Sequence, residues 1–522
     1  MRVLDRNILL GSTDNGGTRN LASTAEGHLE VEIHGPRLPF GEIEVESKFA
    51  EFQVDGVYGI NTNLTESTVS GSGAVASFDG NLIKASTGTT INSAASFQTR
   101  RRLRYRPGQG VLARYTSVYS TPVASSYLLA GVGTSEAGLY FGYSGTTFGI
   151  LHVTGGVREI QTLTVTTGAT SASNVTITLD NVAFVVAVSN SSSTLRTAYE
   201  IASATYTGWT AEQRGSTVVF LASSAGDKTN TMSFGAGTTG AAATIAQTLK
   251  GVASTDTFIP QSSWNGDKLD GTGPSGFTLN PQKGNVYAIN IQYLGYGTIS
   301  FQVEVTYTSG NNAHFVNCHT IKFPNTQTGV NISQPAFPFT MVAYSAGSTT
   351  DVYVATASAA GFRTGAIQRF TGQRSVAIRD TSGYVGSTAA TYYPLFTIRN
   401  SRVFAGRANQ SVGYILSLTG AHDDATPVAY YLIRNMTLLG PVNFVQFSAN
   451  SALYWDQAAT TATLTNNEQI LGAYYAGAQG TLAFRLEDDI AIQPGESVTL
   501  ACRAVTGTAT YVSGSLNIRE DS

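Results

Sequence analysis

The sequence predicts a mainly β protein with an extended N-terminal arm, a split β-sandwich bearing an inserted small α+β module, and a C-terminal jelly-roll-like β-sandwich. The first supporting observation is composition: the chain has 55 glycines, 25 tyrosines and 24 phenylalanines, and only 12% of its residues are charged. Aromatic and β-branched residues favour strands, whereas glycine, serine and threonine favour the turns between them. The second observation is spacing, because short apolar runs alternate with Gly/Ser/Thr turns, as in a sandwich.

The chain of 522 residues is too long for one hydrophobic core, so we expect several domains. Changes in the sequence pattern place their boundaries. The expected regions are an extended attachment and oligomerisation region at 1–90, the first half of a β-sandwich at 91–160, the inserted α+β module at 161–251, the second half of the sandwich at 252–360, a linker at 361–388, and the jelly-roll-like sandwich at 389–522.

Within the N-terminal region, residues 26–46 form a conspicuously acidic stretch. Charged and apolar residues alternate there on both sides of a Pro/Gly bend. Alternation with period two predicts two short strands, each with one polar and one apolar face. Glu42, Glu44 and Glu46 project together from the second of these strands.

The densest positive charge is the run Arg100–Arg106. On a strand, its alternate arginines share one face: Arg100, Arg102, Arg104 and Arg106. One interpretation is a site for nucleic acid or an anionic glycan. The interpretation that we prefer pairs this face with the three glutamates, within one chain or between subunits, because the two stripes have matching period and opposite charge. Replacing the three glutamates by glutamine should then weaken assembly, which oligomer size and thermal stability would measure.

Two local signals organise the inserted module. Asp180-Asn181 predicts a tight turn between two strands. The stretch 193–202 has helical periodicity, with Ser193 or Thr194 as the expected N-cap.

Several binding classes are disfavoured by charge and composition. A formal net charge of −3 argues against nucleic acid as a partner of the whole chain. Cys318 and Cys502 are expected to be buried thiols, and no zinc-ligand spacing occurs, so we expect neither a metal nor another cofactor. The sequence has no apolar run long enough to insert into a membrane. The charged start Met1–Arg6 is unlike a signal peptide, so we expect folding in a cytoplasm.

Candidate chemical sites are few. Acidic pairs such as Asp267 with Asp270 lie in Gly-rich stretches where solvated carboxylates are ordinary, and the common hydrolase motifs do not occur, so we expect no catalytic residues. A possible glycan contact combines aromatic and acidic side chains at a sandwich rim: Trp264, Asp267, Tyr293 and Tyr296. Core packing of the tryptophan is the preferred interpretation.

Parts of the sequence resemble virion structural proteins of tailed bacteriophages and of some large DNA viruses. The resemblance rests on the stretch Glu26–Glu46, on Ser263–Leu269 and on the ending from Gly495 to Glu520. In that group, modular β-rich chains serve as tail-fibre, baseplate or capsid-associated components. The resemblance implies a location in the virion, with assembly in the host cytoplasm, and it brings no catalytic residue with it.

Together these observations lead to the hypothesis of a non-enzymatic virion structural protein. It would be a tail- or baseplate-associated component, or a fibre or spike, that displays sandwich modules for particle assembly and host-surface contact. We expect it to bind other virion proteins and to form a homo-oligomer, a trimer by analogy with fibres. The alternatives are a carbohydrate-binding or polysaccharide-degrading adhesin that recognises a host-surface glycan, and a protein that decorates or cements a capsid.

Overall fold

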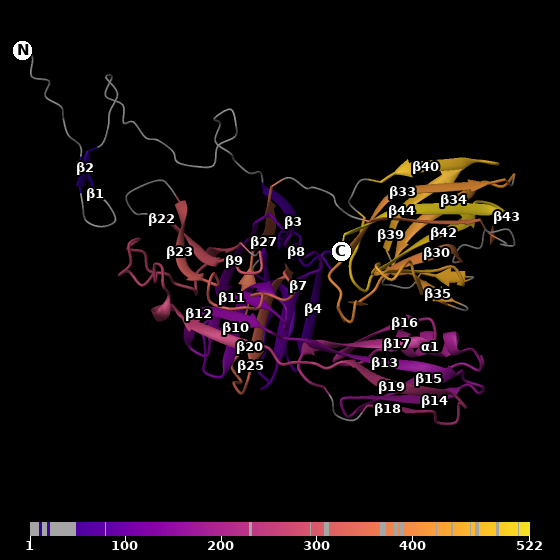
Figure 1. Ribbon diagram of the computed structural model, residues 1–522, viewed down its shortest axis with the longest axis horizontal. Coiled ribbons are helices and arrows are strands. Elements are labelled where there is room, and N and C mark those ends of the chain that lie inside the picture. Colours follow the sequence, from indigo (N-terminus) through magenta and orange to yellow (C-terminus); the bar gives the residue numbers. More distant parts are fainter. Residues whose placement is uncertain are drawn as a thin grey trace, which may run out of the picture. The chain divides into compact units, whose positions relative to one another are not determined.

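The computed structural model divides into the compact units Met1–Ser47 and Lys48–Ser522 (Figure 1). In the first unit, β1 (Leu10–Ser12) pairs antiparallel with β2 (Thr18–Asn20). The second unit holds antiparallel sheets, and the prediction of a mainly β protein is confirmed. The residues that the structure describes are 10–12, 18–20, 48–78, 80–228, 232–292, 294–306, 313–365, 372–379, 385–386, 391–423, 425–439, 442–459, 461–464, 469–486, 490–509 and 511–521.

The first sandwich is built from two facing sheets in the described part of the chain. One sheet contains, in spatial order, β20 (Thr255–Pro260), β12 (Thr147–Thr154), β11 (Gly138–Ser144), β10 (Ser126–Gly133), β25 (Phe339–Ser345), β7 (Ala94–Thr99) and β4 (Thr65–Ser70). The other contains β23 (Ala313–Ile321), β22 (Ile299–Thr306), β21 (Asn285–Ile291), β9 (Val111–Tyr119), β26 (Tyr353–Thr356), β6 (Leu82–Ser86) and β5 (Ala74–Phe78), with β27 (Ser358–Thr364) pairing to β9 and to β3 (Lys48–Asp55). Two short elements lie beside them, the strand pair β8 (Leu103–Arg104) with β24 (Ala336–Phe337) and the 3-10 turn η1 (Gln261–Ser263).

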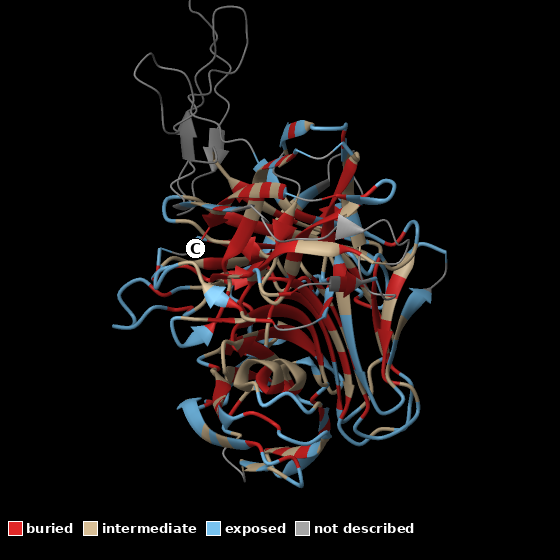
Figure 2. Ribbon diagram, turned by 90° about the vertical axis from the view of Figure 1, so that its right-hand side faces the viewer, coloured by how far each residue is buried: buried red, intermediate tan, exposed pale blue. Residues whose placement is uncertain are grey.

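Alternating burial along these strands forms the core of the first sandwich. Figure 2 shows the buried residues of the described chain in red. Tyrosines within the core link the sheets. The hydroxyl of Tyr115 on β9 donates to the carbonyl of Ala130 on β10 at 2.8 Å, and that of Tyr119 donates to Phe141 at 2.9 Å. These two buried hydroxyls therefore have partners, which avoids the cost of an unpaired polar group and fixes the two sheets against each other.

The boundaries of the first sandwich differ from the predicted ones. β3 to β6 belong to its sheets, so it begins at Lys48 and residues 48–90 are not an extended arm. Likewise β28 (Gly372–Arg379) lies inside the predicted linker 361–388 but pairs with the C-terminal strand β44 (Val512–Asp521). The strands β4, β5 and β28 are rich in small and polar residues, which weakens the apolar alternation that marks a strand. In addition, β3 pairs with β27 and β28 pairs with β44, so the partners of these two strands lie far away in the sequence.

The inserted module leaves and re-enters the first sandwich through neighbouring strands, because β12 and β20 pair along Thr154↔Thr255. One of its sheets orders β16 (Trp209–Arg214), β17 (Thr217–Ala225), β13 (Arg158–Thr167) and β19 (Ala242–Leu249). The other orders β15 (Val182–Val188), β14 (Ser173–Leu179) and β18 (Ser233–Gly235). The helix α1 (Thr194–Ser203) packs Ala198 and Ile201 into the module's own core.

Both local signals of the inserted module are confirmed. Asp180 and Asn181 have φ of 50° and 64° and connect β14 to β15. Positive φ at both central residues is the two-residue hairpin turn that matches the twist of the strands, and aspartate and asparagine tolerate it. Ser193 caps α1, because its side-chain oxygen accepts a hydrogen bond from the Arg196 backbone N–H at 3.3 Å.

Replacing this cap gives a small, local prediction. Ser193→Ala removes the acceptor for an otherwise unsatisfied helix N–H, so it should lower the free energy of unfolding of the inserted module by about 1 kcal/mol. Urea denaturation followed by circular dichroism would measure the change. Ser191→Ala, which removes a nearby exposed hydroxyl, is the control and should have little effect. Equal effects of the two variants would contradict the capping role.

The C-terminal sandwich also has two facing sheets within the described ranges. One orders β28, β44, β33 (Val412–His422) and β40 (Thr481–Arg485), with β41 (Ala491–Ile492) beside β33. The other orders β36 (Val445–Gln446), β37 (Leu453–Asp456), β30 (Tyr393–Asn400), β42 (Ser497–Ala504), β34 (Val428–Arg434) and β39 (Gln469–Ala476). Short pairs at its edges are β29 (Val385–Gly386) with β43 (Thr508–Ala509), β31 (Val403–Phe404) with β32 (Arg407–Ala408), and β35 (Thr437–Leu439) with β38 (Thr461–Thr463).

The order of its long strands is informative. The eight long strands of the described module can be numbered one to eight in chain order: β28, β30, β33, β34, β39, β40, β42 and β44. In this numbering the spatial order of the strands is 1-8-3-6 in one sheet and 2-7-4-5 in the other. Each sheet thus takes strands from both halves of the module. This interleaving is the order expected of a double-sheet jelly roll, in which two Greek keys fold together.

The cysteines lie in separate cores, Cys318 in the first sandwich and Cys502 in the C-terminal one. Both are buried thiols, as predicted, and burial raises the pKa of the Cys318 thiol. In the described part of the chain, helices long and apolar enough to cross a membrane do not occur.

Candidate functional site

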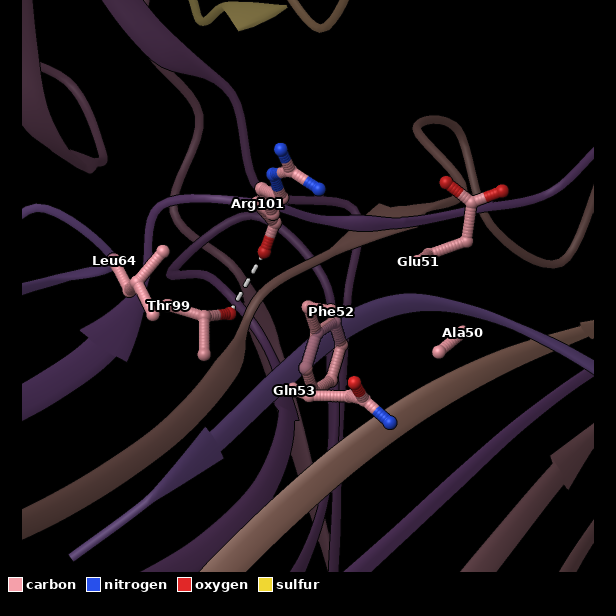
Figure 3. Close-up of a pocket in the computed structure, with 7 residues that line it drawn as sticks. All are labelled: Ala50, Glu51, Phe52, Gln53, Leu64, Thr99 and Arg101. Carbon is pink, nitrogen blue, oxygen red and sulfur yellow. Dashed lines mark hydrogen bonds between the residues drawn. The ribbon is translucent and has the colours of Figure 1, made fainter. Parts of the chain in front are cut away.

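The arginine run does not form the single strand that its alternation predicts. β7 ends at Thr99, and the short β8 begins at Leu103. Between them the Arg100 N–H donates to the Leu64 carbonyl at 2.8 Å, and the Thr99 hydroxyl donates to the Arg101 carbonyl at 2.8 Å (Figure 3). These bonds turn the backbone, and β8 then places the Leu103 side chain in the core.

Three of the four alternate arginines of the run have acidic partners in the described structure. Arg100 lies 3.6 Å from Glu66 on β4, in a partly exposed pair. Arg104 and Arg106 both bind Asp521, at the end of β44: Arg104 Nη1 donates to the Asp521 carbonyl at 2.6 Å, and Arg106 pairs with the carboxylate. Glu42, Glu44 and Glu46 lie outside the described residues, so their predicted pairing with this run stays a prediction.

Arg102, the remaining alternate arginine, has an unusual environment. Burial and the nearby positive charge of Arg158 lower the pKa of Arg102 to about 10, although Glu66 and Glu136 act in the opposite direction. Removal from water disfavours the charged form of a guanidinium. The lowered pKa therefore means that the nearby carboxylates offset only part of the cost of burying the Arg102 charge.

A cavity of about 180 Å³ lies beside the run, and we call it the arginine cavity. It is lined by residues of the first sandwich and of the C-terminal sandwich: Ala50, Glu51, Arg101, Arg102, Arg104, Arg106, Arg363, Val412, Tyr414, Gln493 and Arg519. Six guanidinium groups thus line the cavity together with the Glu51 carboxylate, and Asp521 pairs with two of these arginines. The formal net charge of the whole chain is −3, so this concentration of positive charge is local.

Arg363 on β27 is the most buried arginine of this set, with 2% of its surface exposed. Its Nη1 lies 2.6 Å from Glu51 Oε1 in an ion pair, but neither Nη1 nor the buried Nε has a hydrogen-bond partner of suitable geometry among the described residues. Burial lowers the pKa of Arg363, Glu51 opposes that change, and Arg106 adds to it. The guanidinium is therefore buried with only part of its hydrogen-bonding capacity used.

Neutral groups complete the wall of the cavity. The Arg519 guanidinium lies over the Tyr414 ring at 4.6 Å, a cation–π geometry. Burial raises the pKa of Tyr414, with a further contribution from Glu51 and Asp521, so its hydroxyl stays protonated near neutral pH. The Oε1 atom of Gln493 is buried without a hydrogen-bond partner in the described structure.

A second cavity of about 220 Å³ adjoins the arginine cavity and shares Ala50, Glu51 and Arg101 with it (Figure 3). Its other lining residues are Phe52, Gln53, Leu64 and Thr99. Its lining thus holds fewer charged groups than that of the arginine cavity.

The inserted module and the C-terminal sandwich also meet at a buried polar contact. Glu212 on β16, 4% exposed, accepts hydrogen bonds from the Arg214 Nη2 at 2.6 Å, from the Arg402 N–H at 2.7 Å and from the Ser401 hydroxyl. Arg399 donates to the Gln213 carbonyl while its guanidinium lies 3.9 Å from the centre of the Phe444 ring.

The pKa of Glu212 reflects these contacts. Burial acts to raise it, but Arg214, Arg399 and the hydrogen bonds from Ser401 and Arg402 outweigh burial and hold the pKa of Glu212 below its usual value. A carboxylate buried in this way is charged at neutral pH and is satisfied from both modules. Further contacts are the hydroxyl of Tyr199 on α1, which donates to Leu438, and an apolar cluster formed by Ile160, Val219, Leu221, Val403 and Ala408.

The predicted glycan contacts are not brought together as a surface site. Trp264 is only 3% exposed and packs edge-on against Phe141, with ring centres 5.9 Å apart, so its indole belongs to the core and cannot stack on a sugar. Asp267 is buried and accepts hydrogen bonds from the Leu269 and Ser275 N–H groups, which fixes the surrounding loop.

The predicted glycan contact also includes two tyrosines, Tyr293 and Tyr296. Tyr296 is 41% exposed, and its hydroxyl donates to the Thr328 carbonyl at 2.7 Å. Tyr293 lies outside the described residues. Among the described residues, no group of three or more His, Cys, Asp or Glu side chains is placed to hold a metal ion.

The sequence alone did not identify Arg363, Glu51, Tyr414 or Asp521 as neighbours of the arginine run. Arg363 fell in a predicted linker, and Asp521 is separated from Arg106 by 415 positions. The sequence held only a weak signal for these neighbours. An arginine or aspartate that interrupts an alternating apolar strand indicates a buried ionised group, and such a group needs a partner.

No family model and no curated protein matches the sequence. Among solved structures, a legume lectin-like domain from Entamoeba histolytica matches with a TM-score of 0.24 and 8% identity, over 57% of this chain and 89% of the other. An engineered GH43 glycoside hydrolase matches with a TM-score of 0.22 and 10% identity, over 68% and 48%. The binding domain of botulinum neurotoxin DC matches with a TM-score of 0.21 and 9% identity, over 84% and 89%. Likenesses of this strength assign neither a family nor a function.

Proposed function

We propose that this chain is a non-enzymatic virion structural protein, associated with a tail or baseplate or forming part of a fibre or spike. The observation that carries the proposal is the way in which its β modules are joined. Asp521 of the C-terminal sandwich binds two arginines of the first sandwich, and Glu212 of the inserted module is satisfied by Ser401 and Arg402.

Joints of this kind favour a building block over a set of flexibly linked domains. Interfaces between domains of one chain are often loose, and relative motion is the usual expectation. Buried charges held from both sides oppose such motion, because opening the joint would leave them unpaired. The jelly-roll strand order of the C-terminal sandwich agrees with the proposal by analogy, since this architecture is common in viral capsid and lectin domains.

The state of a candidate acidic pair supports a non-enzymatic role. A glycosidase needs one carboxylic acid with a raised pKa to protonate the leaving group. Burial acts to raise the pKa of Asp267, but hydrogen bonds from Leu269 and Ser275 outweigh it and the pKa is lowered. Hydrogen bonds from the Thr272 hydroxyl and N–H lower the pKa of Asp270 as well. Both carboxyls are therefore held as anions by their own loop.

In this proposal the chain assembles as a homotrimer, and the region before Lys48 contacts other subunits or other virion proteins. The decisive test is gold labelling of purified particles with an antibody raised against the full chain. Label on tails or fibres is the expected result, whereas label on the capsid surface would favour a decorating protein. Particles without label would overturn the virion role. Light scattering of the purified chain measures the number of subunits.

A further inference from the structure

We propose that the arginine cavity is a binding site for a tetrahedral oxyanion, a phosphate or sulfate group. Such binding is independent of the proposed virion role, because it depends only on the charges and space of the cavity. The proposal rests on the local excess of positive charge, on unused hydrogen-bonding atoms in the wall and on the size of the space.

Six guanidinium groups line the arginine cavity, and the described carboxylates that pair with them are Glu51 and Asp521. Like charges held together out of bulk water repel more strongly than they would at the surface. A doubly charged anion would offset part of this positive charge. Arginine suits this task because its planar fork gives paired hydrogen bonds to phosphate and sulfate oxygens.

Two lining residues of the cavity, Arg363 and Gln493, have buried polar atoms without a partner in the described structure. Arg363 is almost fully buried, and an unpaired Nε costs stability unless a small shift of the guanidinium lets a ligand supply an acceptor. The buried Oε1 of Gln493 is also without a partner, and exchanging the positions of the amide oxygen and nitrogen would place an NH₂ donor at this buried position. Glu51 also lines the cavity, but its carboxylate is paired with Arg363 at 2.6 Å.

The size and position of the site suggest what binding does. A space of about 180 Å³ accommodates a single phosphate or sulfate group. Arg102 and Arg363 belong to the first sandwich, whereas Gln493 and Arg519 belong to the C-terminal one. A bound anion would therefore bridge the two sandwiches and stabilise their joint, since a ligand that binds the folded state raises its stability.

Two kinds of ligand present a tetrahedral oxyanion of this chemistry. One is the free inorganic ion, and the other is a sulfate or phosphate ester carried by a sugar. The cavity of about 220 Å³ shares Arg101 with the arginine cavity and offers Gln53 as a polar group, so a sugar ring could occupy it while its ester group enters the arginine cavity (Figure 3).

Isothermal titration calorimetry and thermal denaturation of the full chain test the site. The ligands are sodium phosphate, sodium sulfate and a sulfated disaccharide, each compared with sodium chloride at equal ionic strength. Arg363→Gln is the direct variant. Arg101→Gln, at an exposed position of the rim, is the second and keeps the test valid if the first does not fold. The control is Arg485→Gln, which removes the same charge from an exposed position on β40.

For the wild-type chain and the Arg485 variant, we expect saturable binding and a rise in melting temperature beyond that in chloride. The Arg101 and Arg363 variants should bind about tenfold more weakly or worse, because each loses a charged hydrogen bond. Sulfate stabilises many proteins without binding, so the difference between variants is the decisive quantity. Tighter binding of the disaccharide than of sulfate identifies a sugar-borne ester, and equal binding identifies the free ion. Equal responses of all variants, or no saturable binding to the wild type, would overturn the proposal.

Discussion

Replacing Asp521 by asparagine should lower the free energy of unfolding by about 3 kcal/mol. The Asp521 side chain is 9% exposed and pairs with both Arg104 and Arg106, whose side chains are 17% and 24% exposed. Asparagine keeps the shape but removes the charge, which leaves two partly buried guanidinium groups unpaired beside Arg363. The result should be a lower melting temperature in calorimetry, with the joint between the two sandwiches as the part that loosens first.

A surface ion pair provides the control for this prediction. Asp227 lies 3.1 Å from Lys250, and the side chains are 40% and 65% exposed. Asp227→Asn should change the free energy of unfolding by about 0.5 kcal/mol or less, because water and salt screen an exposed pair. Asp521→Glu, which keeps the charge but lengthens the side chain, should recover part of the loss. If the asparagine variants at 521 and 227 behave alike, Asp521 does not hold the two sandwiches together.

The joints were difficult to predict for a simple physical reason. Sequence patterns report on neighbours along the chain: the turn at Asp180-Asn181 and the cap at Ser193 each depend on fewer than ten consecutive residues, and both were predicted. The pairing of β28 with β44 joins strands at opposite ends of the C-terminal module, and the residues of neither strand indicate which strand it pairs with. Register is set by which faces become buried, which only the assembled sandwich decides.

The same distinction applies to the candidate site. The arginine run was identified because its charges are adjacent in sequence, but its partners Glu66 and Asp521 come from β4 and β44. The preferred interpretation of the run as an ion-pairing face depended on matched spacing. The structure shows that Arg104 and Arg106 do pair with a carboxylate, although this carboxylate comes from the other end of the chain. Trp264 could not be assigned from its neighbours in the sequence, because an aromatic residue beside polar loop residues can lie in the core or at the rim. Its contact with Phe141 and its burial place it in the core.

Glu212→Gln should lower the free energy of unfolding by a similar amount, about 3 kcal/mol, and should also change how stability depends on pH. Glutamine preserves the size of the side chain, but Arg214 and Arg399 then lose the buried negative charge between them. Urea denaturation would measure the loss. Fluorescence can report each module, since Trp209, Trp264 and Trp455 lie in the inserted module, the first sandwich and the C-terminal sandwich.

The expected pH dependence follows from the lowered pKa of Glu212. The ordinary glutamate value is 4.5, and in the folded chain the pKa lies below it. The unfolded state therefore takes up the proton first as the pH falls, so the contribution of Glu212 is fully present above pH 4.5 and is lost as the pH falls through the folded-state pKa.

Measurement of unfolding from pH 6 to pH 3 should thus show a steeper loss of stability for the wild type than for Glu212→Gln. Ser401→Ala is the matched control, because it removes one hydrogen bond to Glu212 but leaves its charge and both arginines. That variant should cost about 1 kcal/mol and keep the steeper slope. Parallel slopes for the wild type and Glu212→Gln would mean that the carboxylate titrates alike in the folded and unfolded chain. The joint between the inserted module and the C-terminal sandwich would then depend on its apolar cluster and on its other hydrogen bonds, such as that from Tyr199 to Leu438.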